Sequence, residues 1–502
     1  IQRIRQIGLF AGAGLDYRGR YIVDALLRRD GSSLFGPDNR WATFGRVSAA
    51  WRLAQEPWWS IPAVSELKLH SSYGTAGGSP RFDAQYETFN VGVGGLLSLV
   101  TLGNRQLKPE LHKETEVGVD LELWNRYALN VTYSHANIND QILPVPVSAS
   151  TGFQRQWQNA GALTNKTWEM SLNIPLTQRR DLQWNARFIY DRNRSVVTAL
   201  DVPPFFFGAD LQGTGSIFQV RVGERLGTFY GHRFITGCAE LPANFQSQCG
   251  GPNSAFQQND EGFLVWVGAG NNPGMGISDN LWETSVSNPS NNPNVTPWGI
   301  SVLNWGAPIL LRDSTRAALN VALGNALPDF RFGVAQDVRY KRLSVYALLD
   351  AAVGQKVWNQ GFHWAHLDFL SHDVDQVGKS VEAAKPIGYY WRTSPAHGFT
   401  GIRGFYDQLL PNNYTVEDAS YAKVRELLVS YRIGPINRFG DWEIAVVGRN
   451  LWTIAGYRGF DPEVGLSGGN ALNSPASAAI NAVDAFTFPN LRTFTVGLSS
   501  TF

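Results

Sequence analysis

The sequence predicts an all-β protein in which antiparallel strands form a transmembrane β-barrel, and three observations lead to this fold class. Segments of alternating apolar and polar residues recur in pairs along most of the 502 residues. Their connections alternate between short reversals and long segments rich in Gly, Pro, Asn and Ser, which is typical of barrels with short turns on one side of the membrane and long loops on the other. The last segment, 492–502, alternates in the same way and ends on an aromatic residue.

The clearest hairpin reverses direction at residues 124–126. Before the turn, Val117, Val119, Leu121 and Leu123 alternate with Glu116, Asp120 and Glu122, and apolar alternation resumes at Tyr127. We expect the apolar set to face lipid and the carboxylates to face the lumen or the loops. Similar patterns predict about fourteen strands in all, including hairpins at 168–190 and 330–352 and strands at 5–17, 20–29, 41–53, 66–75, 228–235, 421–432 and 442–451.

In the terminal segment, Phe494, Val496, Leu498 and Phe502 share one face, and small polar residues occupy the other. The length suits the ~9–11 residues of a tilted membrane strand. A half-buried strand of a soluble sheet has the same alternation, so the rest of the chain has to distinguish the two.

Composition limits the function classes. Lys+Arg 43 and Asp+Glu 42 leave a formal net charge of +1, so no basic field is present to attract nucleic acid. No apolar run approaches the ~18 residues of a membrane-spanning helix, whereas barrel strands place only half of their residues toward lipid. Aromatic residues make up 12% of the chain, which suits interfacial girdles or a soluble glycan-binding protein.

The two cysteines, Cys238 and Cys249, lie close together in a segment rich in Gly, Pro and Asn. This spacing favours a local disulfide in an oxidising compartment over a metal site. The first residue is Ile1 and no signal peptide precedes it, so we expect a mature product or a fragment.

No catalytic, metal or cofactor site emerges from the residue pattern. Asp461 and Glu463 have no partner carboxylate that the sequence places opposite them, and Ser32 lacks a nucleophile elbow, so both motifs are read as structural. His363 and His366, with Asp368, would bind a metal only on a helix or in a tight loop. Residues 259–262 (NDEG) are rich in oxygen ligands but lack the spacing of a calcium loop. Trp266, Trp282 and Trp298 are candidates for stacking on sugar rings, with loop packing as the alternative.

Short motifs follow one another in order along the chain: 29–36 (RDGSSLFG), 49–53 (AAWRL), 118–121 (GVDL), 159–161 (NAG), 324–330 (GNALPDF), 448–453 (GRNLWT) and 459–464 (GFDPEV). This ordered series resembles the SusC/RagA type of TonB-dependent outer-membrane transporters.

The resemblance implies that residues 1–502 are the C-terminal portion of a barrel of about 22 strands, with the plug domain absent and long extracellular loops around 202–304 and 354–420. It implies an outer-membrane importer of oligosaccharides or peptides in a Gram-negative bacterium rather than an enzyme. A SusD-like surface lipoprotein and the TonB complex, reached through the absent plug, are the implied partners. The resemblance also implies that Phe502 acts as an assembly signal. The alternative is an extracellular β-rich polysaccharide-binding protein or glycan-degrading enzyme, in which burial would vary from strand to strand.

Overall fold

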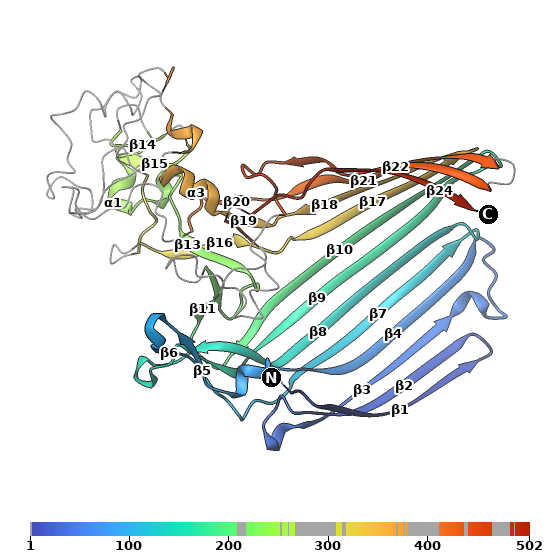
Figure 1. Ribbon diagram of the computed structural model, residues 1–502, viewed down its shortest axis with the longest axis horizontal. Helices are drawn as coiled ribbons and strands as arrows, with labels where there is room; N and C mark the ends of the chain where they lie inside the picture. Colours follow the sequence, from blue (N-terminus) through green and yellow to red (C-terminus); the bar gives the residue numbers. More distant parts are fainter. Residues whose placement is uncertain are drawn as a thin grey trace.

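The computed structural model describes residues 3–207, 217–250, 254–259, 261–266, 308–313, 318–367, 370–375, 377–379, 411–435, 440–463, 482–485 and 487–501. Within them, one large twisted sheet carries a second layer of smaller sheets and short helices at one end (Figure 1). No helix in these residues is both long and apolar enough to cross a bilayer.

The main path of the large sheet contains thirteen strands, and each is antiparallel to its neighbours. In spatial order they are β1 (Gln6–Tyr17), β2 (Tyr21–Ser32), β3 (Trp41–Arg52), β4 (Val64–Gly78), β7 (Glu110–Leu123), β8 (Tyr127–Pro146), β9 (Arg155–Gln178), β10 (Leu182–Leu200), β17 (Phe330–Tyr340), β18 (Leu343–Val353), β21 (Tyr421–Pro435), β22 (Asp441–Ala455) and β24 (Thr493–Thr501). The hairpin of β5 (Thr88–Val91) and β6 (Leu97–Leu102) joins the sheet beside β9.

The register gives this sheet one apolar and one polar face. Val119 lies opposite Val131, while Asp120 lies opposite Asn130. Because side chains alternate along a strand, this pairing repeats from strand to strand and keeps like side chains on the same face. Val117 and Val119 are 46% and 37% exposed, as expected for an apolar face that no other part of the described chain covers.

Short turns join the strands at the end of the sheet remote from the second layer (Figure 1). Arg18 and Gly19, Trp124 and Asn125, and Lys341 all have left-handed backbone conformations, with φ between 50° and 67°. Left-handed residues allow tight turns to match the right-handed twist of the flanking strands. We call this end of the sheet the short-turn rim.

The second layer is built from the long connections. Its sheets are formed by β11 (Phe205–Phe207), β12 (Phe218–Val220), β13 (Thr228–His232) and β16 (Asn320–Asn325), by β14 (Phe256–Gln258) and β15 (Leu264–Trp266), and by β19 (Lys356–Asn359), β20 (Val416–Asp418) and β23 (Val483–Asp484). Its described helices are α1 (Ala243–Gln246), α3 (Gln360–Leu367) and the 3-10 turns η6 (Cys238–Glu240) and η9 (His372–Val374). The other described 3-10 turns lie in connections between strands of the large sheet: η1 (Pro37–Asn39), η2 (Leu53–Gln55), η3 (Phe82–Gln85), η4 (Val93–Gly95) and η5 (Ala149–Thr151).

One sequence expectation needs correction here. The strand expected at 228–235 is present as β13, but it pairs with β12 and β16 in the second layer instead of joining the large sheet. The first four residues of β13 are buried, so neither face is available to lipid. Beyond the long connection expected at 202–304, β16 also belongs to the second layer.

The largest apolar cluster among the described residues lies where the second layer meets the far ends of β8, β9 and β10. Leu143, Ala160 and Val197 from these strands pack with loop residues such as Phe218 and Trp358, and all five are nearly inaccessible to solvent. This core therefore fixes the loops to the end of the sheet.

Candidate functional site

The polar face of the large sheet carries a network of hydrogen bonds across neighbouring strands. Lys68 Nζ lies 3.0 Å from Asp120 Oδ2, and Asn130 donates to Asp120 Oδ1 at 2.8 Å. Ser171 on β9 continues the network by donating to Asn130 at 3.2 Å. A sheet with this face inward would line a hydrated channel, as the interior of a membrane barrel does.

A buried ion-pair network lies where β18 and β21 meet the second layer. Lys423 Nζ lies 2.5 Å from Asp461 Oδ1 and 2.7 Å from Glu463 Oε2, and the side chain of Lys423 is 1% exposed. Arg425 contacts Glu463 on one side and donates from Nε to Asp350 at 2.9 Å on the other. Tyr421 completes the network by donating to Glu463 at 2.7 Å. We call these six residues the β21 network.

A β-bulge explains how β21 supplies two neighbouring inward charges to this region. The register with β18 and β22 shifts between Val424 and Glu426, so Arg425 is the extra residue. Arg425 therefore joins the β21 network, while Glu426 also faces inward and bonds Arg449 at 2.8 Å. Bulges commonly re-aim side chains at the rims of sheets.

The β21 network keeps the carboxylate of Glu463 ionised. Burial alone would raise the pKa of Glu463, but hydrogen bonds from Arg425, Lys423 and Tyr421 lower that pKa to about 2. The loop after β22 is thereby tied to the wall of the sheet over a wide pH range. Sequence analysis assigned Asp461 and Glu463 a structural role but did not identify Lys423, Arg425 or Asp350 as partners. The feature of the sequence that could have indicated these partners is the pair Lys423 and Arg425, two cations placed two residues apart on one expected strand.

The loop after β22 makes a further set of contacts within the second layer. Tyr457 donates to Asp484 at 2.7 Å, and burial together with this carboxylate raises the pKa of the Tyr457 hydroxyl. The guanidinium of Arg458 stacks 3.8 Å from the ring centre of Phe362 and 4.5 Å from that of Tyr414. Through these contacts, Tyr457 and Arg458, which follow β22 in the chain, join the loop to α3, β20 and β23.

The two histidines lie on helix α3, as a metal pair would require. Both are fully buried, and His366 bonds the carbonyl of Phe362 at 2.9 Å and Asp373 at 3.2 Å. Burial lowers the pKa of His366. Asp368 lies outside the described residues, and the residues that are described contain no group of three His, Cys, Asp or Glu side chains placed to hold a metal ion.

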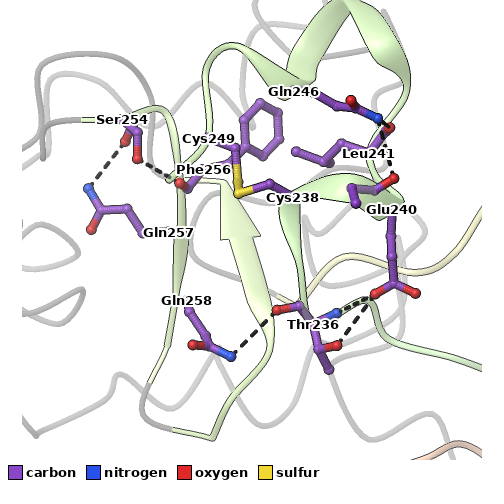
Figure 2. The surroundings of a disulfide bond; sticks show 11 residues. Thr236, Cys238, Glu240, Leu241, Gln246, Cys249, Ser254, Phe256, Gln257 and Gln258 are labelled. Atoms are coloured by element: carbon purple, nitrogen blue, oxygen red, sulfur yellow. Dashed lines mark hydrogen bonds between the residues drawn. A yellow bond between two sulfur atoms is a disulfide. The ribbon is translucent and has the colours of Figure 1, made fainter. Parts of the chain in front are cut away.

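The structure brings the two cysteines together. The Sγ atoms of Cys238 and Cys249 are 2.05 Å apart, and the two residues are eleven positions apart in the chain (Figure 2). Leu241 and Phe256 pack in the same small core. The bond therefore links η6 to the segment that follows α1, next to the hairpin of β14 and β15.

The other candidate residues are only partly placed. Trp266 ends β15, but its side chain, together with Trp282 and Trp298, lies outside the described residues. Asn259 Oδ1 accepts hydrogen bonds from the backbone N–H groups of Glu261 and Phe263, so this oxygen is used by the turn itself. Phe494, Val496 and Leu498 are 69%, 69% and 63% exposed on one face of β24; Phe502 lies outside the described residues, and its role in assembly stays a prediction.

Comparisons with known structures agree with this fold. The structure of the RagAB peptide importer in the closed-closed state superposes with a TM-score of 0.66 and 20% sequence identity, over 98% of this chain and 47% of the other. At this identity the similarity establishes the fold alone.

Sequence comparison leads to the same group of proteins. The TonB-dependent receptor P3 of Formosa agariphila is 26% identical over 99% of this chain and 45% of its own length. The TonB-dependent receptor SusC of Bacteroides thetaiotaomicron is 21% identical over 99% of this chain and 44% of its own length. The chain thus spans somewhat less than half the length of these curated relatives. Residues 1–451 match the family described as TonB dependent receptor-like, beta-barrel, and the chain belongs to that family.

Proposed function

We propose that this chain forms part of the wall of an outer-membrane, TonB-dependent importer of the SusC/RagA type. The observation that carries the proposal is the two-faced sheet, in which thirteen strands keep an apolar face and a polar face in register. An apolar outer face suits lipid, and a polar inner face suits a solute pathway. Residues 1–502 then form the C-terminal portion of the barrel, with the second layer on the extracellular side.

The substrate class is a large nutrient, either an oligosaccharide or a peptide. RagAB is a peptide importer, which supports a peptide substrate, and SusC is a TonB-dependent receptor, which supports import through TonB. The proposed partners are a SusD-like surface lipoprotein over the second layer and the TonB complex on the periplasmic side. Transport rather than catalysis is the proposed activity.

The test is uptake by cells that carry the complete gene. Fluorescent oligosaccharides and peptides are offered to wild-type cells, to a deletion strain and to a strain without TonB. We expect accumulation of one substrate class to be lost in both mutants and restored when the complete gene is returned. Unchanged uptake in the deletion strain would refute the proposal. Recovery of the protein in culture medium with polysaccharide-cleaving activity would instead support an extracellular enzyme.

A further inference from the structure

The short-turn rim carries three cations that stack on aromatic rings of the apolar face. The Arg18 guanidinium lies 5.1 Å from the ring centre of Tyr17, and the Lys341 amine lies 5.4 Å from that of Tyr340. The Arg126 guanidinium lies 5.2 Å from the ring centre of Tyr127. Each distance is within the range of a cation–π contact.

Two of the rings beneath these cations, Tyr17 and Tyr340, belong to an aromatic belt. Tyr17, Tyr21 and Trp51 follow one another across three strands with ring centres 6.3 Å apart at each step, and Tyr340 and Tyr431 extend the belt on later strands. All five side chains are between 37% and 51% exposed. Such belts mark the level of lipid headgroups in membrane proteins.

The charges of the three stacked cations differ from those of three other arginines at the short-turn rim. Arg20, Arg52 and Arg432 are neutralised by Glu56, Glu66 and Asp441, at distances of 2.6–2.9 Å. Arg18, Arg126 and Lys341 make no ion pair with any residue in the described part of the chain. Arg126 is held by the carbonyls of Pro175 and Leu176, which fix its position but leave its positive charge.

The spacing of the three cations follows from the strand order. The β1–β2, β7–β8 and β17–β18 turns are successively four strands apart in the sheet, which corresponds to about 19 Å between neighbouring turns. Single cations at this spacing suit separate small anions along the perimeter better than one extended polyanion.

We propose that the short-turn rim binds the phosphates of anionic phospholipids through Arg18, Arg126 and Lys341. This inference rests on the proposed function, because it requires the apolar face to lie in a membrane. In outer-membrane barrels the short turns are periplasmic, so the ligands are headgroups of the inner leaflet. The aromatic ring fixes each cation at headgroup depth, and the absence of a carboxylate partner leaves its charge for the lipid.

The experiment measures lipid preference around the complete transporter. The protein is reconstituted in vesicles of phosphatidylcholine mixed with brominated phosphatidylglycerol or with brominated phosphatidylcholine, and bromine quenching of tryptophan fluorescence reports which lipid occupies the rim. Trp51 stacks on Tyr21 near Arg18, and Trp184 lies opposite Val338, two residues before the ring under Lys341, so these two tryptophans serve as reporters. The double variant Arg18→Gln and Lys341→Gln avoids Arg126, whose contacts with backbone carbonyls make it a risk for folding.

We expect the wild type to prefer phosphatidylglycerol and the double variant to lose up to about fivefold in preference per cation removed. The wild-type preference should also fall as salt is added. The matched control is Arg28→Gln, which removes the same charge from the polar face, where Arg28 pairs with Asp30 at 2.7 Å.

Equal preference in the wild type and the double variant, or the same loss in the Arg28→Gln control, would overturn the inference. A protein that does not insert into vesicles at all would count against the proposed function as well. A protein that inserts but shows no lipid preference would remove the inference alone. If the double variant does not fold, the single Lys341→Gln variant gives the same comparison.

Discussion

Replacing Lys423 with Met should detach the loop after β22 from the wall of the sheet. The substitution keeps most of the aliphatic stem and removes the amine that lies 2.5 Å from Asp461 and 2.7 Å from Glu463. Glu463 retains Arg425 and Tyr421, whereas among the described residues Asp461 keeps only backbone donors, the N–H groups of Glu463 and Asn490. Most of the lost stability therefore comes from Asp461, which loses its cationic partner while its side chain is only 7% exposed.

Removing one partner of a buried ion pair costs about 3–5 kcal/mol. The backbone donors that remain at Asp461 place the expected value near the lower limit, about 3 kcal/mol, which is roughly a hundredfold in the equilibrium for local opening. Hydrogen exchange of the complete protein in detergent measures this directly. Amides of residues 457–463 should exchange about a hundredfold faster, while the centres of β7 and β8 should be unaffected.

Lys356→Met is the matched control. Lys356 pairs with Asp418 at 3.0 Å, but the two side chains are 30% and 56% exposed, so its loss should cost under about 1 kcal/mol. Equal exchange in the two variants would refute the view that burial makes the β21 network strong.

The pH dependence provides an independent measure of the same contact. The folded-state pKa of Glu463 is lowered to about 2 from an ordinary value of 4.5. A lowered pKa stabilises the folded state above the unfolded pKa, and that stability is lost as the pH falls from about 4.5 toward about 2. Wild-type protection of residues 457–463 should therefore decrease over this interval, and Glu463→Gln should abolish the dependence. A protection profile that stays flat in the wild type would contradict the assignment.

Three further outcomes are expected. Val119→Arg should lower the folded yield in outer membranes, because a mid-depth cation on the lipid face costs roughly 2–4 kcal/mol, whereas Glu122→Arg on the opposite face should assemble normally; equal yields would argue against the assignment of faces. Alkylation should label Cys238 and Cys249 only after reduction, and their loss should destabilise the loop by roughly 2–3 kcal/mol; labelling without reduction would exclude the bond. Tyr457→Phe should cost about 1–3 kcal/mol in local stability by removing a hydrogen bond to the buried carboxylate of Asp484, which keeps its backbone hydrogen bond from Thr487; hydrogen exchange near β23 would measure this loss.

The sequence was sufficient for the hairpins because their information is local. The alternation from Val117 to Leu123 determines which side chains share a face, and the short turn at Asn125 sets the register with the next strand. The structure confirms both, with Leu121 opposite Leu129. The family resemblance, read from short motifs in order along the chain, is confirmed by the match over residues 1–451.

The second layer could not be predicted in the same way. Lys423 and Asp461 are 38 residues apart, and their contact depends on how β22 and the loop after it return to the sheet. The segment at 228–235 alternates too little to distinguish a membrane strand from a buried one, and its burial within the second layer decides the outcome. Trp282 and Trp298 lie outside the described residues, so their proposed contact with sugars stays a prediction.

The longest strands of the large sheet extend beyond the length needed to cross a bilayer, so their two ends have different surroundings. β9 has 24 residues, but a tilted strand crosses a bilayer with ~9–11. On the half of β9 that leads to the short-turn rim, Met170 is 39% exposed, as a lipid-facing residue would be, whereas at the other end Ala160 is 2% exposed in the core of the second layer. In the proposed transporter, the apolar side chains of a single strand are therefore covered by lipid at one end and by loops at the other. A charge introduced at Met170 should impair membrane assembly. The same charge at Ala160 should disorder the second layer and leave the membrane strands paired.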